Sequence, residues 1–189
     1  MSWNTFHRRG ETLRAVVDRA NERRDGVLPM GVPGVAENFT DELDLVGALM
    51  LTWHARLSGN IERGLARQPM DLEGAVASAW QTTAKELPGV RLVIDQCLDN
   101  PGRPEMEHAM QRAREAAWVR LAAAAGLASG RGPAAVAAGR RVEERARLGP
   151  AAAAPPETVE RAVSGAPVDA GRSRSALSLA DRIRAVLAA

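Results

Sequence analysis

Residues 40–69 read TDELDLVGALMLTWHARLSGNIERGLARQP. Large apolar side chains recur there at steps of three and four residues, at Leu43, Val46, Met50, Trp53, Leu57, Ile61 and Leu65. This spacing lines one face of an α-helix about six turns long and is typical of a helix that packs in a bundle. Thr40 is the expected N-cap, because the carboxylates that follow it lie where the helix dipole favours negative charge. Pro69 ends the helix.

Five further helices are predicted from the same kind of spacing. They lie at about residues 3–24, 71–87, 90–98, 104–126 and 127–148. Proline and glycine separate them, and residues 27–34 form a connector with two prolines among glycines. No segment alternates polar and apolar residues as a strand does. The predicted fold class is therefore all-α, a bundle of about five to six helices followed by a flexible tail.

The predicted organisation has three parts. Residues 1–148 form the bundle domain, residues 149–174 a flexible linker rich in alanine and proline, and residues 175–189 a short amphipathic helix. The linker has few large apolar side chains, so burial cannot offset its ordering entropy. The apolar stripe of the terminal helix consists of Leu179, Ile183, Val186 and Leu187.

These four residues are candidates for partner binding. A helix this short is marginal alone in water. Two alternatives stay open: the helix enters a groove on a partner or sister subunit, or it packs back on its own bundle.

The net charge of +2 is unevenly distributed. Residues 1–26 carry six basic and four acidic side chains, residues 27–102 carry five and ten, and residues 103–189 carry fourteen and nine. The simplest interpretation is self-complementarity, in which the basic ends pack around the acidic middle. The charge alone therefore does not indicate nucleic-acid binding.

Cysteine content and hydropathy favour a cytoplasmic protein. Cys97 is the only cysteine, which rules out an intrachain disulfide and a thiolate metal cluster. No run approaches the roughly 20 apolar residues that span a bilayer, and the first residues lack a signal segment. We expect no association with a membrane.

One pattern suggests a metal site. Glu105 and His108 lie one helical turn apart, as in the Glu-x-x-His pairs of di-iron bundles, although such bundles use two pairs. His7 and His54 add an imidazole on each of two other predicted helices. The competing interpretation is that these are solvated or hydrogen-bonded histidines. His54 follows the seam residue Trp53 directly and is not expected to point inward, so no cofactor is expected.

A second pattern resembles a degenerate helix-turn-helix over residues 76–98. A small residue precedes a turn that contains Gly89, which would let two helices cross closely. Pro88 shifts the glycine by one position, and the second helix carries Asp95 and Asp99, which would face phosphates. Two core helices joined by a tight turn are the favoured explanation of the pattern, and nucleic acid is not the expected partner.

Catalytic motifs are absent from the sequence. It contains no Gly-x-Ser-x-Gly elbow, no Gly-x-Gly-x-x-Gly and no Walker loop. Trp3, Trp53, Trp80 and Trp118 lie on four different predicted helices, where core or interface positions are the expected role. The sequence favours a non-enzymatic interaction or regulatory module with a protein partner or a sister subunit. A metal-binding bundle that uses His54 and His108, and a nucleic-acid-binding regulator, are the alternatives.

Residues 3–98 resemble a family of small all-helical cytoplasmic proteins from GC-rich bacteria. The resemblance rests on Leu45-Val46-Gly47-Ala48-Leu49, Trp53-His54-Ala55-Arg56-Leu57 and Leu87-Pro88-Gly89-Val90-Arg91. It implies a bacterial cytoplasmic setting and carries no established activity.

Overall fold

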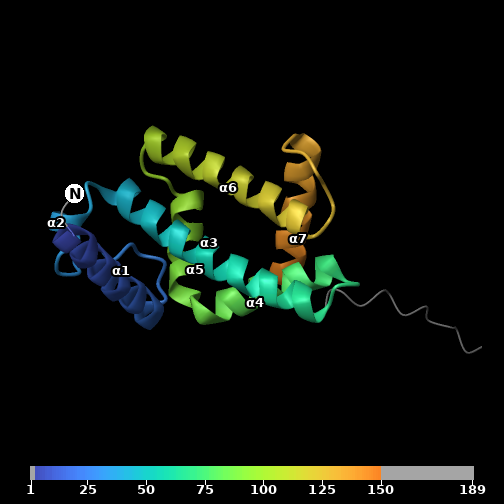
Figure 1. The fold of residues 1–189 in the computed structure, drawn as a ribbon. Helices are drawn as coiled ribbons and strands as arrows, with labels where there is room; N and C mark the ends of the chain where they lie inside the picture. The colour runs from blue at the N-terminus through green and yellow to red at the C-terminus, as the bar shows by residue number, and fades with distance from the viewer. Residues whose placement is uncertain (1–2, 150–189) are drawn as a thin grey trace, which may run out of the picture. The chain divides into compact units, whose positions relative to one another are not determined.

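The computed structural model describes residues 3–149, with side chains from His7 onward. This part of the chain contains seven helices and no strand, which confirms the all-α prediction. Figure 1 shows their arrangement. The helices are α1 (Trp3–Arg23), α2 (Val35–Asn38), α3 (Glu42–Arg67), α4 (Leu72–Glu86), α5 (Pro88–Asp99), α6 (Pro104–Ala124) and α7 (Pro133–Leu148).

The predicted seam of α3 is buried. Val46, Met50, Trp53 and Leu57 belong to the core, and Leu43, Ile61 and Leu65 are partly buried against it. Leu45 and Leu49 are also fully buried, so the buried face is wider than a single stripe. The reason is that α1, α4 and α5 all contact α3.

The predicted N-cap of α3 is wrong by one residue. The N-cap is Asp41, whose carboxylate accepts a hydrogen bond of 2.8 Å from the backbone N–H of Asp44. The Asp44 carboxylate reaches back and accepts from the backbone N–H of Thr40 at 3.0 Å. Thr40 therefore does not cap the helix, and its own backbone N–H is bound by a side chain. The carboxylates of Asp41 and Asp44 satisfy free N–H groups of this turn.

Helices α4 and α6 begin where the sequence predicts, whereas α5 begins at Pro88, two residues before the predicted start at residue 90. Asp71 caps α4 by accepting from the backbone N–H of Gly74 at 2.9 Å. Pro88, Pro104 and Pro133 are the first residues of α5, α6 and α7. A proline suits this position because its missing N–H would have no partner in the helix anyway.

Helix α2 lies within a region that the sequence analysis left without a helix. Gly34 precedes it with φ of +88°, a left-handed conformation that a glycine adopts without strain. Val35 and Phe39 at its two ends are buried. Four residues are too few to show a helical repeat, so periodicity could not reveal this turn.

Two glycines allow helices to cross closely. A Cβ at Gly89 of α5 would lie 1.8 Å from the backbone O of Ala20 in α1, and a Cβ at Gly139 of α7 would lie 1.8 Å from the backbone O of Trp118 in α6. Any larger residue would force the backbones apart. Gly89 thus serves the crossing of α5 with α1, and not the crossing of α4 with α5 that the sequence suggested.

Ion pairs join the basic ends of the described chain to its acidic middle. Arg9 pairs with Asp44, Arg103 with Glu42, Arg145 with Glu73 and Arg147 with Asp95. Every one of these contacts links an arginine before residue 27 or after residue 102 to a carboxylate between those limits. The charge distribution in the sequence predicted this complementarity.

Several predictions fall outside the described residues. These are nearly all of the linker over 149–174, the terminal helix over 175–189, and the candidate partner-binding residues Leu179, Ile183, Val186 and Leu187. Among the helices that are described, none is both long and apolar enough to pass through a membrane.

We predict that Gly139→Ala lowers the free energy of unfolding by about 3 kcal/mol, because the added methyl group must displace the backbone of Trp118. Gly10→Ala is the matched control. Gly10 is also inside a helix, but a Cβ there meets nothing within 4 Å. It should raise stability by about 0.5–1 kcal/mol through the helix preference of alanine. Urea denaturation measures both, and equal effects would contradict the close crossing.

Candidate functional site

The four candidate metal ligands do not form a cluster. Within residues 7–149, no group of three or more histidine, cysteine, aspartate or glutamate side chains is placed to hold a metal ion. Glu105 and His108 are exposed on the first turns of α6, and His7 is exposed on α1. His54 lines a cavity on the core-facing side of α3, away from the exposed face of that helix. The expectation that His54 does not point inward is therefore wrong.

The helices of the candidate helix-turn-helix are part of the core. Helix α5, the second of the pair, contacts α1, α3, α4 and α6. Its residues Val90, Val93 and Ile94 are buried. Arg91 pairs with Asp95 on the same helix and is not free to reach a phosphate. This geometry agrees with two core helices joined by a tight turn.

Three tryptophans lie at the centre of the fold, each beside an arginine. Trp53 of α3 and Trp80 of α4 pack edge to face, with ring centroids 5.6 Å apart. Arg91 lies 5.0 Å from the Trp53 ring, and Arg147 lies 5.2 Å from the Trp80 ring. Trp118 of α6 is also buried and carries Arg114 at 4.7 Å. The expected core role is confirmed for these three tryptophans.

A polar network connects three helices around this centre. Arg147 of α7 donates to both carboxylate oxygens of Asp95 in α5, at 2.8 and 3.1 Å, and to Glu143 at 2.7 Å. The indole N–H of Trp118 donates to the other Glu143 oxygen at 2.7 Å. Burial acts to raise the pKa of Asp95, but hydrogen bonds from Arg147 and Arg91 outweigh it and hold that pKa below its usual value.

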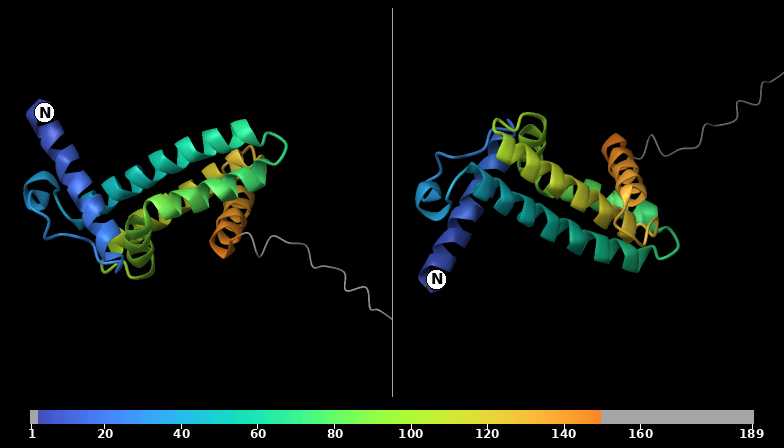
Figure 2. Two further views of the ribbon diagram at one scale, coloured as in Figure 1. Left: turned by 90° about the horizontal axis from the view of Figure 1, so that it is seen from below. Right: turned by 90° about the horizontal axis from the view of Figure 1, so that it is seen from above.

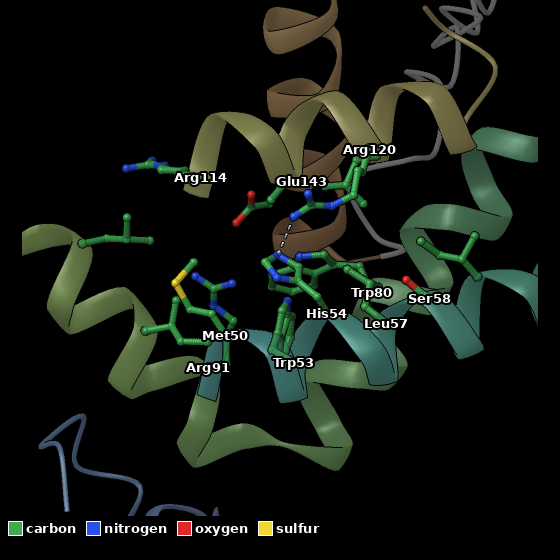
Figure 3. Close-up of a pocket in the computed structure, with 15 residues that line it drawn as sticks. Met50, Trp53, His54, Leu57, Ser58, Trp80, Arg91, Arg114, Arg120 and Glu143 are labelled. Atoms are coloured by element: carbon green, nitrogen blue, oxygen red, sulfur yellow. Dashed lines mark hydrogen bonds between the residues drawn. The ribbon is translucent and has the colours of Figure 1, made fainter. Parts of the chain in front are cut away.

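His54 faces the same network across a small cavity, as Figure 3 shows. Its Nε2 lies 3.4 Å from the guanidinium of Arg120 on α6. Burial, and then the positive charges of Arg120 and Arg91, lower the pKa of His54 to about 4, although Glu143 acts in the opposite direction. The imidazole is neutral at neutral pH, so Nε2 can accept a hydrogen bond from Arg120.

The cavity beside His54 is too small for a cofactor. Its volume is about 60 Å³, which is room for roughly four water molecules, whereas ligand pockets typically occupy about 300–1,000 Å³. A base with a pKa near 4 is weak at neutral pH. Burial, together with the charge of Glu42, raises the pKa of Cys97, which lowers the fraction of thiolate at neutral pH. The side chains of this centre hold helices together.

A much larger groove of about 930 Å³ runs between α1 and α3. Figure 2 shows α1 lying across the first turns of α3, after which the two helices diverge. The α3 wall contains small residues with one large apolar side chain: Gly47, Ala48, Leu51, Thr52, Ala55 and Gly59. It also contains three charged residues, Asp44, Arg56 and Arg63. Leu51 is 71% exposed, and no described residue covers it.

Arg9 fixes the α1 wall of the groove. Its guanidinium donates to both oxygens of Asp44, at 2.6 and 3.1 Å, and also to the carbonyl oxygen of Asn38. It lies 4.2 Å from the centroid of the Phe39 ring. Hydrogen bonds from Arg9 and from the backbone of Thr40 lower the pKa of Asp44, so the pair stays charged. Arg9 therefore ties α1 to the start of α3 beside the groove.

The groove was not predicted from the sequence, although a signal was present. Gly47, Leu51, Ala55 and Gly59 recur every four residues, opposite the buried seam. A Cβ at Gly47 meets nothing within 4 Å, and a Cβ at Gly59 meets only the end of Arg63 at 3.5 Å. The fold of the described residues therefore does not require glycine at either position, and each glycine lowers helix stability by about 1 kcal/mol relative to alanine.

Comparison of the chain with protein-family models, curated proteins and solved structures finds no match in any of the three. The resemblance to helical proteins of GC-rich bacteria stays a prediction.

We predict that protonation of His54 destabilises the fold in mild acid. The pKa is about 4 in the folded protein and about 6.5 when unfolded, so the unfolded state binds the proton first as the pH falls. The stabilisation that comes from keeping His54 neutral is complete above pH 6.5. At most about 3 kcal/mol of the free energy of unfolding is lost by pH 4. Denaturation of wild type and His54→Gln between pH 7.5 and 4 tests this.

The difference between the two curves isolates His54 from carboxylates that also titrate. His54→Gln should flatten the pH dependence, whereas His108→Gln, at an exposed position, should leave it unchanged. Parallel curves for wild type and His54→Gln would show that the imidazole is not held neutral.

Proposed function

We propose that this protein is a non-enzymatic protein-interaction module, and that its docking surface is the groove between α1 and α3. The observation that carries this proposal is the exposed Leu51, which lies in an apolar groove along the longest helix of the described chain. The proposal keeps the cytoplasmic setting that the sequence favours.

The shape of the groove favours an α-helix as its occupant. Small residues along α3 let the backbone of another helix approach to the 8–10 Å typical of packed helices. Leu51 would then fill the space between the side chains of that helix. An apolar stripe laid into such a groove is a recurrent mode of peptide recognition.

The charges at the groove favour an occupant that carries acidic side chains. Arg9, Arg56 and Arg63 line the groove, and its one lining carboxylate, that of Asp44, is already bound by Arg9. A helix with carboxylates along its edge would match this positive lining. Electrostatic complementarity of this kind selects orientation and partner more than it adds affinity.

The test is site-specific photocrosslinking of the full chain in its native cells. A photoreactive amino acid in place of Leu51 should form a covalent adduct with a protein, because the groove brings that protein within contact distance. Leu148 is the matched control, since it is 70% exposed on α7, outside the groove.

An adduct at position 51 and none at position 148 supports the docking groove. No adduct at position 51, or equal labelling at both positions, overturns it. In a second arm, Ile183→Glu in the full chain asks whether the predicted terminal helix is the occupant.

A further inference from the structure

We infer that the cavity beside His54 binds a small oxyanion of the phosphate or sulfate class, and that Arg114 and Arg120 of α6 supply the charge that holds it. The two arginines line the cavity and have no carboxylate partner, whereas the other charged groups around it are paired. The residues of α3 that line this cavity are not those that line the docking groove, so the site goes beyond the proposed function.

The paired charges at the cavity cancel one another. Arg91 binds Asp95, and Arg147 binds both Asp95 and Glu143. Both oxygens of Glu143 are occupied, because the indole N–H of Trp118 donates to one and Arg147 donates to the other. Two guanidinium groups and two carboxylates thus form a network without net charge. The positive charge of the cavity therefore comes from the arginines of α6.

Arg114 and Arg120 have no ion pair in the part of the chain that the structure describes. Arg114 lies 4.7 Å from the ring of Trp118, and Arg120 approaches Nε2 of His54 at 3.4 Å. A guanidinium carries five N–H donors, so most of the donors remain available to a ligand. Figure 3 shows Arg120 reaching from α6 toward His54, with Arg114 further along the same helix.

The imidazole of His54 senses a positive potential in the cavity. The charged groups that face it are Arg91 of α5, Arg120 of α6 and Glu143 of α7, whereas Trp80 brings no charge from α4. Burial and then the two arginines lower the pKa of His54 to about 4, and Glu143 offsets this only in part. A potential that disfavours a further positive charge stabilises a negative one.

The size of the cavity suits an oxyanion better than an organic ligand. Its volume of about 60 Å³ is room for roughly four water molecules, and phosphate and sulfate each present four oxygen atoms. Apolar side chains of Met50, Leu57 and Leu121 line the rest of the wall. Hydrogen bonds from arginine to an anion are strong beside such a wall, because less water competes for them.

Calorimetric titration of the full chain with sodium phosphate, at constant ionic strength, tests the inference. Wild type should bind one phosphate, and Arg120→Gln should weaken binding at least about tenfold through the loss of charge-assisted hydrogen bonds. Glutamine keeps a donor for His54. Arg112→Gln is the matched control, since Arg112 is exposed on the same helix and does not line the cavity. No saturable binding to wild type, or equal loss in both variants, overturns the site.

The melting temperature of the anion-free protein separates binding from a structural role. Arg120→Gln should not lower this temperature, because Arg120 has no carboxylate partner to lose, but it should abolish the increase that phosphate causes in wild type. Arg114→Gln is a second variant that should also weaken phosphate binding. A less stable Arg120→Gln that still binds phosphate as wild type does would show a structural arginine and overturn the inference.

Nuclear magnetic resonance of the His54 ring locates the bound ion. Sulfate is the probe here, because it keeps both negative charges across the titration of an imidazole. A sulfate next to His54 should move the pKa of the ring upward in wild type and not in Arg120→Gln, and sulfate should therefore bind more tightly as the pH falls. An unchanged titration of His54 while sulfate binds would place the ion elsewhere and overturn the site.

Phosphate and phosphoserine distinguish two sources of the same chemistry. Tighter binding of phosphate identifies a free ion, whereas tighter binding of phosphoserine identifies the phosphate group of a larger ligand that enters past the exposed Arg120. Both results support the site, and binding of neither compound overturns it. Crosslinking at Leu51 does not depend on these results, so the docking groove and the oxyanion site can fail separately.

Discussion

The edge-to-face packing of Trp53 against Trp80 is the contact on which the rest of the described fold depends. It joins α3 to α4 at the point where α5 and α7 also arrive, because Arg91 and Arg147 lie over the two rings. Large flat side chains bury much area with few rotatable bonds. With tyrosine absent and phenylalanine present only twice, these rings supply volume that alanine cannot.

Arginine, rather than a further apolar residue, closes this centre because the same side chain covers a ring and binds a carboxylate. Arg147 contacts Trp80, Asp95 and Glu143 at once, so one residue of α7 orients it against α4 and α5. A bidentate guanidinium fixes direction as well as distance. This explains why basic residues of the last described helix match acidic residues of the middle segment, and why α7 lies steeply across α6 instead of along it (Figure 1).

The sequence predicted what depends on neighbours along the chain. The seam of α3, the prolines that open α6 and α7, and the Asp71 cap are all set within one or two helical turns. The sequence did not predict features that depend on how many helices meet at one place. His54 lies one residue beyond the seam, but α5, α6 and α7 converge there and widen the buried arc until it includes His54. The groove was missed for the converse reason, since α1 covers only the first turns of α3.

The two faces of α3 differ in what they contribute. One face stabilises the fold, and the other is exposed and open to association. Leu45, Leu49 and Trp53 face the core, whereas Leu51 and Ala55 stand on the opposite side of the same turns. A change at Leu51 removes little buried area from the fold, so its effect on stability is small compared with the several kcal/mol expected for a truncation at Leu49. Selection on the outer face can therefore act almost independently of selection on the core. A leucine kept exposed between two glycines lowers solubility and helix stability, and a partner helix at that face would compensate both losses.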